Sequence, residues 1–353
     1  MSHDHRDDPT DTSLTYKRSG VDIETADVLV KRFAALAKAT HTEGVMPGHG
    51  AYASLFRPRL GHLQDPLIAT TCDGVGTKVL VARDVGWFAG LGQDLVAMNV
   101  NDLLPVGAKP LLFLDYIAAG KLNVDTLETV VAGVAAACTE AGCALVGGET
   151  AEMPDVYARD DFDLAGFALG LVDGANVPSG DAVTPGDWAL ALPSRGVHAN
   201  GLSLARRALF DRGNLAPGDV PAGFRRSVGR ELLEPTAIYV AQVLQLMDVF
   251  RVKAAAHITG GGLLGRAQRL VGAGRRLILD SASYERPPIF DLIARCGGVT
   301  DEEMARTFNM GLGYVVIVAP DDAREILSRH RDWLDVGRVV EGNTGVDLGY
   351  ATS

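Results

Sequence analysis

The chain has 353 residues, of which 47% are hydrophobic and 22% are charged, and its formal net charge is −11. This balance is typical of a globular protein and excludes a disordered or fibrous one, and the acidic charge without a Lys/Arg cluster argues against a nucleic-acid binder, because affinity for the phosphate backbone requires a basic surface. The length exceeds what one hydrophobic core usually covers, so we expect two domains.

The cellular setting follows from what the chain lacks. The apolar stretches 111–119 and 130–137 are far shorter than the roughly 18 residues of a membrane-spanning helix, so we expect no membrane insertion. Residues 1–11 have no apolar core of the kind that a signal peptide needs. The four cysteines lack Cys-x-x-Cys spacing. We therefore expect a cytoplasmic protein with reduced cysteines, preceded by a disordered tail over residues 1–15.

The first structured segment is a helix with a glycine-rich loop behind it. Asp22 is a suitable N-cap for a helix that ends near Thr40. Residues 44–52 then hold three glycines and a proline without a helix or strand pattern. Such a segment is typical of a flap that covers phosphates, with Gly48 and Gly50 near the ligand, or of a plain surface loop; the two interpretations are equally favoured.

The stretch 67–78 is an apolar run that ends in a polar turn. Residues 67–71 predict a buried strand, which the glycines interrupt. The turn has the groups that a metal-bound polyphosphate requires, namely a carboxylate, close backbone approach and a cation. They are Asp73, Gly74, Gly76, Thr77 and Lys78. By itself the pattern favours an ordinary turn, and it is too short for a Walker phosphate loop.

A long helix is predicted over 87–106, and it carries polar residues in an apolar setting. Asp94 and Asn101 are seven residues apart and lie on nearly the same face, with Asp102 one position further round. Carboxylates buried without partners are costly. The stripe therefore indicates an inward-facing site, with a solvated helix rim as the alternative.

A third polar strand end follows. We predict strands at 110–116, 144–146 and 162–172 and a helix over 124–141 that stops at Gly142. The strand at 144–146 runs into the segment 147–154, whose glycines and Glu149 resemble the turn after residue 71. Two such strand ends with an acidic helix between them favour a bound cation. The Gly- and Pro-rich stretch 173–187 is the expected domain junction.

The second half repeats this theme of strands that end in ligand-type loops. We predict strands at 188–192, 256–258 and 314–318 and helices that start near 203, 263 and 320. The loop 194–203 contains His198 and Asn200, which suit an anionic or polar ligand, although a lone His is more often a cap or a surface residue. Three glycines follow Thr259, and a phosphate cradle explains them better than packing alone.

Collected in order, these loops resemble the aminoimidazole ribonucleotide synthetase family, also called phosphoribosylformylglycinamidine cyclo-ligase. The resemblance runs from residue 16 to the last strand region. Its motifs are YKRSGVDI at 16–23, TCDGVGTK at 71–78, QDLVAMNVND at 93–102, LVGGETAEMP at 145–154, HANG at 198–201, HITGGG at 257–262 and RTFNMG at 306–311. The flap departs from the family pattern at Pro47 and His49.

The resemblance implies a fold, a reaction and a partner. The fold is an α/β (α+β) protein of two domains, each a mixed sheet flanked by helices: an N-terminal ATP- and Mg²⁺-binding and dimerisation domain at 16–175 and a substrate-binding domain at 176–353. The implied reaction is the ATP-dependent closure of formylglycinamidine ribonucleotide to 5-aminoimidazole ribonucleotide in purine biosynthesis. The implied partner is a second copy of the chain, with the N-terminal sheets building a shared barrel.

The resemblance also assigns roles to the polar residues. Asp73, Asp102 and Glu149 would hold Mg²⁺, with Asp94 and Asn101 as support. Lys78, Thr77 and the glycines of the flap and of the turn would contact ATP. The substrate would lie on His198, Asn200, Asn309 and the loop of Thr259, Gly260, Gly261 and Gly262. His198, His257 or Asp94 would take part in catalysis, since imidazole titrates near neutrality and can move a proton.

Relatives of this architecture are the alternative interpretation. A selenophosphate synthetase would carry a Cys between residues 44 and 52, and a hydrogenase maturation factor would end in a Cys; neither is present. A thiamine-monophosphate kinase would more typically have Asp in place of Glu149. A non-catalytic nucleotide-binding scaffold would not need to retain all the acids together with Lys78.

Overall fold

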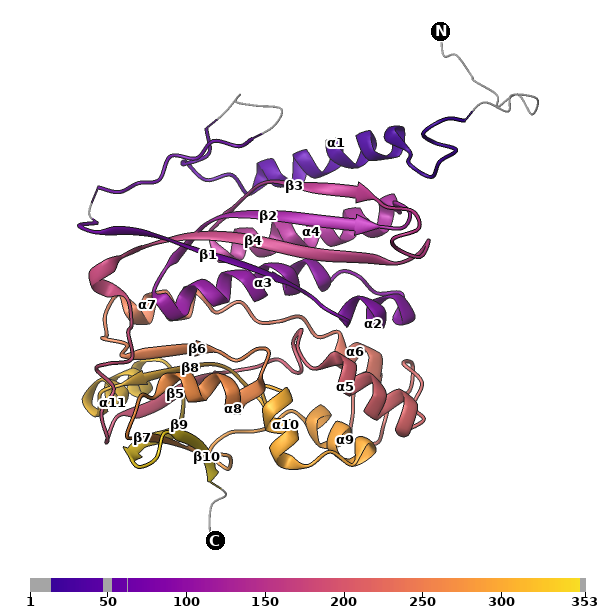
Figure 1. Cartoon of the computed structure of the whole chain (residues 1–353). Coiled ribbons are helices and arrows are strands. Elements are labelled where there is room, and N and C mark those ends of the chain that lie inside the picture. Colours follow the sequence, from indigo (N-terminus) through magenta and orange to yellow (C-terminus); the bar gives the residue numbers. More distant parts are fainter. Residues whose placement is uncertain (1–13, 47–52, 62, 350–353) are drawn as a thin grey trace.

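The computed structural model describes residues 14–46, 53–61 and 63–349, and this part of the chain builds two mixed sheets flanked by helices (Figure 1). The first sheet has the strand order β1-β4-β2-β3 and the second the order β10-β7-β9-β5-β8-β6. The predicted fold class is confirmed, whereas the shared barrel concerns a second copy and stays a prediction. Gly48 and Gly50 of the predicted flap, and residues 1–13 of the predicted tail, lie outside the described residues.

The first half contains one sheet and the helices that cover it. Its strands are β1 (Pro66–Gly74), β2 (Lys109–Ala119), β3 (Ala144–Glu152) and β4 (Phe162–Asp173). Its helices are α1 (Ile23–Ala39), α2 (Lys78–Val85), α3 (Leu91–Leu103) and α4 (Val124–Ala141), with short 3₁₀ turns η1 (Leu104–Val106) and η2 (Gly174–Asn176). β2 and β3 are parallel, and β4 runs antiparallel to both β1 and β2.

The second half contains the larger sheet. Its strands are β5 (Trp188–Pro193), β6 (Ala254–His257), β7 (Arg275–Asp280), β8 (Leu312–Val318), β9 (Leu334–Glu341) and β10 (Gly345–Gly349). Its helices are α5 (Leu202–Arg206), continued by the π-helical turn η3 (Arg207–Arg212), α6 (Val228–Leu232), α7 (Val240–Met247), α8 (Gly262–Ala267) followed by η4 (Gln268–Leu270), α9 (Pro288–Gly297), α10 (Asp301–Thr307) and α11 (Pro320–Arg329). Among the described residues, no helix combines the length and apolarity needed to cross a membrane.

Local sequence signals place several elements correctly. α1 begins after the predicted cap Asp22, whose Oδ1 accepts hydrogen bonds from the backbone of Glu24 (3.1 Å) and Thr25 (3.2 Å). α4 spans the predicted residues and ends at Gly142, whose φ of 69° is a left-handed conformation that glycine adopts at little cost. The predictions of these two helices are confirmed.

Two predictions differ from the structure, and several elements were not predicted. Residues 147–149 continue strand β3 instead of forming a loop, because they pair with β2 from Leu114 to Tyr116. The predicted helix over 87–106 is shorter, and the helix α2 directly after the turn was not predicted. Strands β7, β9 and β10 were also missed, because their sequences have no clear alternation and their stability comes from pairing with distant strands.

Helix α3 is the centre of the molecule. Every residue of α3 except Gln93 and Asp102 is buried, and Figure 1 shows the helix between the first sheet and the second half. A Cβ atom at Gly92 would lie 2.2 Å from the carbonyl oxygen of Val130, so α3 and α4 pack backbone to backbone at this glycine. The buried apolar side chains form one connected cluster through both halves.

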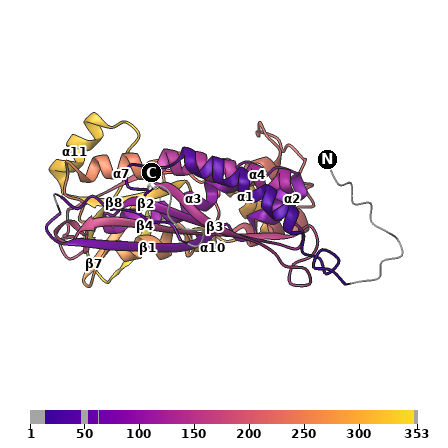
Figure 2. The ribbon, with the colours of Figure 1, turned by 90° about the horizontal axis from the view of Figure 1, so that it is seen from above.

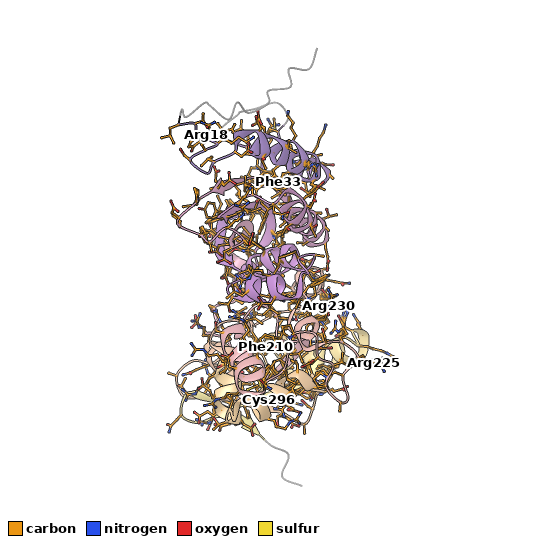
Figure 3. All side chains as sticks on the ribbon, turned by 90° about the vertical axis from the view of Figure 1, so that its right-hand side faces the viewer. Arg18, Phe33, Phe210, Arg225, Arg230 and Cys296 are labelled. Atoms are coloured by element: carbon orange, nitrogen blue, oxygen red, sulfur yellow. The ribbon has the colours of Figure 1, made fainter. Side chains whose placement is uncertain are left out.

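The helices of the first half cover one face of its sheet. Figure 2 shows α1, α3 and α4 gathered on one side of β1, β2 and β4. Along β1, exposed residues of the opposite face alternate with half-buried ones from Ile68 to Asp73, and Ile68 has a relative exposure of 71%. In Figure 3 the two halves lie one above the other, and Arg230 of α6 marks their boundary, where its guanidinium lies 3.7 Å from the ring centroid of Trp87.

Asp115 is a buried carboxylate in the middle of the first sheet. It stands opposite Gly166 of β4 and Gly148 of β3, and a Cβ atom at Gly148 would lie 2.4 Å from Asp115 Oδ1. Gly148 therefore leaves the space that the carboxylate fills. Burial raises the pKa of Asp115 from 3.8 to about 7.

This shift predicts how stability depends on pH. The unfolded chain loses the proton near pH 4 and the folded chain only near pH 7, so the free energy of unfolding falls as pH rises between these values. The variant Asp115→Asn never ionises. We expect it to be more stable than the parent at pH 8, by about 4 kcal/mol at most, and equally stable near pH 4.

Thermal unfolding at pH 4 and pH 8 measures this difference. The control is Asp321→Asn on α11, whose side chain is 97% exposed and should change the thermal midpoint little at either pH. Equal midpoints for the Asp115 variant and the parent at pH 8 would contradict the prediction.

Candidate functional site

Asp73 lies near the end of β1, where Asn99 of α3 holds its backbone. Asn99 Oδ1 accepts from the Asp73 N–H (2.9 Å) and Asn99 Nδ2 donates to the Asp73 carbonyl (3.1 Å). Burial raises the pKa of Asp73 and the nearby Asp102 carboxylate raises it further, while a hydrogen bond from the Gly74 N–H lowers it. Asp73 and Asp102 therefore lie close enough for their charges to interact. Sequence reasoning gave Asn99 no role, although it stands in the same motif as Asp102.

Asp102 at the end of α3 is paired with His257 at the end of β6. The distance from Asp102 Oδ1 to His257 Nδ1 is 2.7 Å. The His257 side chain is 1% exposed and the Asp102 side chain 29% exposed, so the carboxylate is the member of the pair that reaches solvent. This contact joins two residues from opposite halves of the chain.

Glu149 lies apart from these two carboxylates. It is exposed on β3, which β4 and β2 separate from β1, a backbone separation of roughly 14 Å at about 4.8 Å per strand. Across residues 14–46, 53–61 and 63–349, no three His, Cys, Asp or Glu side chains lie close enough together to hold a metal ion. The predicted set of three Mg²⁺ ligands is not assembled within this part of the chain.

Lys78 and Asp94 form a fully buried ion pair. Lys78 Nζ lies 2.8 Å from Asp94 Oδ1 and donates to the Glu234 carbonyl, also at 2.8 Å. Asp94 Oδ1 also accepts from the Thr236 N–H (2.8 Å) and Oγ1 (2.6 Å). Burial lowers the pKa of Lys78, and Asp94 opposes this shift. A phosphate contact from Nζ would require breaking the pair. The roles of Lys78 in ATP binding and of Asp94 in catalysis stay predictions.

The rest of the polar stripe of α3 binds the same segment of the second half, residues 234–239. Asn101 Nδ2 donates to the Ala237 carbonyl (2.8 Å), and Asn101 Oδ1 accepts from the Tyr239 N–H (2.9 Å). Gln93 Nε2 donates to the Thr236 carbonyl (2.8 Å). The stripe faces inward and binds the backbone of the second half, and the ligand role of Asn101 stays a prediction.

The loop after β5 presents His198 in a strained conformation. Its φ is 63°, which is uncommon outside glycine, and its Nε2 accepts from the Arg195 N–H (3.2 Å). Burial lowers the pKa of His198 well below its ordinary value, so the ring is neutral near pH 7. Asn309 holds this loop by donating to the carbonyls of Gly196 (2.9 Å) and Val197 (3.3 Å). Asn309 is buried, and its Oδ1 accepts from Ser194 Oγ at 2.8 Å, so it supports the loop; its contact with substrate stays a prediction.

Several buried polar atoms of this region have no hydrogen-bond partner among the residues that the structure describes. They are His198 Nδ1, Asn200 Oδ1, Thr259 Oγ1 and Tyr314 Oη. Tyr314 stands opposite His257 in the pairing of β8 with β6, and a Cβ atom at Gly260 would lie 3.9 Å from the Asn200 amide, so the atoms belong to adjoining loops and strands. Buried polar groups without partners are costly, and such a set suits a polar ligand. Tyr314 carried no motif signal in the sequence.

The glycines of the predicted cradle after Thr259 divide into two kinds. A Cβ atom at Gly262 would lie 2.4 Å from the Ala305 carbonyl oxygen, so packing explains this glycine. Gly260 and Gly261 border nearly open space, with no atom nearer than 3.9 Å to a built Cβ. Arg266 Nε donates to the Gly260 carbonyl (2.9 Å) and fixes the loop. The open pair leaves room for a ligand to approach the backbone.

The glycines of the turn after β1 also divide into one that packing requires and one that borders open space. A Cβ atom at Gly74 would lie 2.7 Å from the Leu164 carbonyl oxygen, whereas a Cβ atom at Gly76, whose φ is 54°, would have no neighbour within 4 Å. Thr77 Oγ1 lies 3.1 Å from Ser203 Oγ of α5. Gly76 therefore remains open to a ligand, and Thr77 touches the second half beside it.

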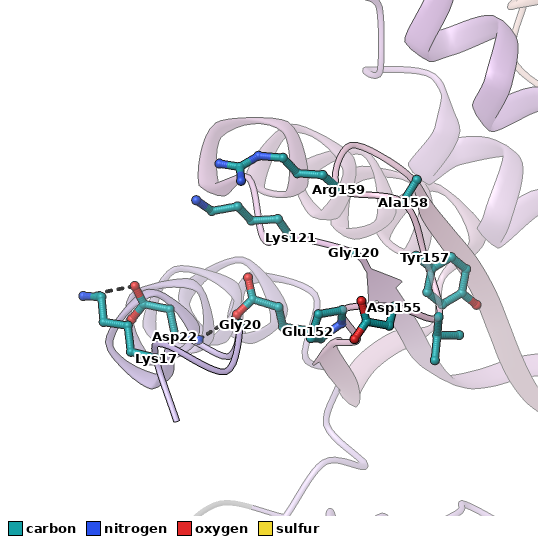
Figure 4. Close-up of a pocket in the computed structure, with 12 residues that line it drawn as sticks. Lys17, Gly20, Asp22, Gly120, Lys121, Glu152, Asp155, Tyr157, Ala158 and Arg159 are labelled. Carbon is teal, nitrogen blue, oxygen red and sulfur yellow. Dashed lines mark hydrogen bonds and ion pairs between the residues drawn. The ribbon is translucent and has the colours of Figure 1, made fainter. Parts of the chain in front are cut away.

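A cavity of about 710 Å³ lies at the carboxyl ends of β2 and β3 (Figure 4). Glu152 accepts there from the backbone N–H groups of Asp22 (2.7 Å) and Leu122 (3.0 Å), which joins two of the sequence motifs. Lys121 and Arg159 point from neighbouring loops on the same side of the cavity. These cations suit an anionic group, but Asp73, Asp102 and His198 do not line this cavity.

Comparison with protein families finds two matching domain models. Residues 55–172 match the N-terminal domain of AIR synthase related proteins, and residues 184–348 match the C-terminal domain of the same group. A phosphoribosylformylglycinamidine cyclo-ligase of Myxococcus xanthus is 49% identical over 332 residues, which cover 93% of this chain and 96% of that protein. Another, from Carboxydothermus hydrogenoformans, is 42% identical over 94% of this chain and 98% of its own length.

Solved structures share the fold at much lower identity. A thiamine-monophosphate kinase of Stenotrophomonas maltophilia superposes with a TM-score of 0.66 at 22% identity, covering 91% of this chain and 95% of that one. The hydrogenase maturation protein HypE, solved in complex with ATP, superposes with a TM-score of 0.64 at 20% identity over 94% of this chain and 93% of its own. These similarities concern the fold alone.

The buried pair predicts a large effect of Lys78→Met on stability. Removing the ammonium leaves Asp94 buried without its counter-charge, so we expect a loss of about 3–5 kcal/mol in the free energy of unfolding, measured by urea titration. The double variant Lys78→Met/Asp94→Leu buries no unpaired charge and should be more stable than the single variant.

The exposed pair of Arg324 with Asp321 is the matched control. Arg324→Met should cost less than about 1 kcal/mol. If Lys78→Met were as mild as this control, the pair would not hold the two halves together.

Proposed function

The chain belongs to the phosphoribosylformylglycinamidine cyclo-ligase family, and from this membership we propose which of its residues carry out the family's reaction. The chain is a ligase of purine biosynthesis that uses ATP to close formylglycinamidine ribonucleotide to 5-aminoimidazole ribonucleotide, releasing ADP and phosphate. The observation that carries this function is the 49% identity to a relative of that name over nearly the whole length of both chains.

The chemistry requires an activated oxygen. The formyl oxygen of an amide is a poor leaving group, so ATP phosphorylates it; a nitrogen of the substrate then attacks the activated carbon, and the carbon–oxygen bond breaks as phosphate leaves. The protein contributes mainly by positioning the groups and by stabilising the charge on the transferred phosphoryl oxygens.

We propose Asp73 and Asp102 as the carboxylates that hold the magnesium ion of Mg-ATP. Both offer carboxylate oxygens, the ligands that Mg²⁺ prefers, and the charge of Asp102 raises the pKa of Asp73. Mg²⁺ is commonly held by one or two carboxylates together with phosphate oxygens and water, so a cluster of three protein acids is not required. When bound, the ion would neutralise phosphate charge. Gly76 and Thr77, at the turn beside Asp73, are the proposed backbone contacts to the phosphates.

The substrate is proposed to lie against the loops of the second half. His198, Asn200 and Thr259 offer polar atoms that have no partner in the described part of the chain, and Gly260 and Gly261 leave space for its ribose phosphate. His198 is neutral near pH 7 because burial lowers its pKa, so the ring can accept a hydrogen bond or a proton at Nδ1.

A homodimer is proposed from the uncovered face of the first sheet. The face is apolar along three neighbouring strands, an arrangement that a second copy would cover. Its residues are Ile68, Thr70, Cys72, Leu112, Leu114, Phe167, Leu169 and Leu171, which pair across β1, β4 and β2. Glu149 stands in register with Tyr116 at the rim of this face, so a shared barrel would place it near the partner. The free, exposed thiol of Cys72 supports the proposed cytoplasmic location.

The variant Asp73→Asn tests the Mg-ATP site. With ATP, Mg²⁺ and formylglycinamidine ribonucleotide, we expect the parent to form the aminoimidazole product and the variant to lose at least about 100-fold in kcat/KM, because a neutral amide is a poor Mg²⁺ ligand. Asp321→Asn on α11 is the control and should keep full activity.

Three outcomes separate the alternatives. An Asp73→Asn variant with unchanged turnover and unchanged Mg²⁺ dependence would refute the metal assignment. Release of ADP by the parent without aminoimidazole product would favour a related kinase. Binding of ATP without turnover would favour a scaffold.

The variant Ile68→Asp tests the dimer. A charge in the middle of the apolar face should split the dimer into monomers, as measured by sedimentation equilibrium. Val220→Asp is the control, because Val220 is 58% exposed on a loop of the second half and should leave the mass unchanged. A parent that sediments as a monomer would overturn the proposal.

A further inference from the structure

The pair of His257 and Asp102 is asymmetric in its access to solvent. The Asp102 side chain is 29% exposed, whereas the His257 ring is 1% exposed. Tyr239 packs against the ring at 6.3 Å between centroids, and Tyr314 stands opposite His257 on the neighbouring strand. A reacting group can therefore reach the carboxylate without touching the imidazole.

The hydrogen bonds of Asn101 determine which nitrogen of His257 carries the hydrogen. Asn101 Oδ1 accepts from the Tyr239 N–H (2.9 Å) and Nδ2 donates to the Ala237 carbonyl (2.8 Å), so the orientation of the amide is fixed by two backbone groups. The same Nδ2 lies 3.4 Å from His257 Nε2. Because Nδ2 is a donor, Nε2 must accept and bears no hydrogen. The hydrogen is then on Nδ1, which donates to Asp102 Oδ1 at 2.7 Å.

We propose that His257 is a positioning residue that holds the Asp102 carboxylate in place for Mg-ATP, and that it does not transfer a proton to or from the substrate. Both ring nitrogens are engaged inside the protein, so neither is available to a reacting atom. The bond to Oδ1 fixes the rotation of the carboxylate and leaves Oδ2 for the ligand. This inference rests on the proposed role of Asp102 in the metal site.

Three substitutions at one position distinguish positioning from proton transfer. His257→Asn places an amide N–H near the position of Nδ1 and can still donate to Asp102. His257→Gln places its amide N–H near the position of Nε2 and cannot make that bond. His257→Leu removes every hydrogen bond. None of the three can transfer a proton, so a catalytic His257 would make all three equally inactive.

The first measurement is the dissociation constant for Mg-ATP by calorimetry, beside kcat. We expect His257→Asn to stay within about fivefold of the parent in both quantities. His257→Gln and His257→Leu should bind Mg-ATP about 10–100-fold more weakly, as is common when a residue that orients a metal ligand is lost. Thermal unfolding of each variant shows whether it is folded, and only folded variants are compared.

The second measurement needs no turnover. Two-bond ¹H–¹⁵N spectra of the ¹⁵N-histidine-labelled parent protein report the tautomer, and the signal absent from His257→Asn is that of His257. We expect hydrogen on Nδ1 and none on Nε2. Hydrogen on Nε2, or a folded His257→Asn variant that binds Mg-ATP normally but has lost kcat as fully as His257→Leu, would overturn the proposal. If the parent formed no aminoimidazole product, the proposed function would fail, while the tautomer and the Mg-ATP affinities would still decide the role of His257.

Discussion

The buried ion pair between Lys78 and Asp94 holds the two halves of the molecule together. Neither side chain has access to water. Lys78 Nζ and Asp94 Oδ1 bind backbone and hydroxyl groups of the segment 234–239, whereas Asp94 Oδ2 has only the Lys78 ammonium beside it. A buried charge is tolerated only when its partner and its remaining hydrogen bonds are in place. The position of the segment is therefore tightly specified, and with it the position of the whole second half relative to α3.

The candidate site depends on that position because its parts come from both halves. Asp73 and Asp102 belong to the first half, and His257, Thr259 and the open glycines belong to the second. Asn101 links the position of the second half to the candidate site directly. Its amide binds the segment 234–239 through Ala237 and Tyr239, and it also contacts the His257 ring that holds Asp102. The polar residues of α3 therefore have two uses. Those on its inner face bind the segment 234–239, and Asp102 at its end presents an exposed carboxylate.

Glycine has two different uses in these loops, and they separate only in three dimensions. Gly74 and Gly262 are required because a side chain would collide with a backbone carbonyl, whereas Gly76 and Gly260 border open space. The sequence presents all four as the same residue in similar motifs. Of these four, only Gly76 and Gly260 leave space beside the backbone.

The sequence by itself determined the features that rest on local physics and on family motifs: the cap at Asp22, the helix that ends at Gly142, the two-sheet class and the reaction. It could not determine what Asp94 and Lys78 contact, because their partners Glu234 and Thr236 lie more than a hundred residues away and carry no pattern that names them. The tertiary structure decided that the polar stripe of α3 binds the segment 234–239, that Glu149 lies apart from Asp73, and that His257 is enclosed. Each of these is a long-range contact, and long-range contacts depend on how the elements pack and not on the residues beside them in the chain.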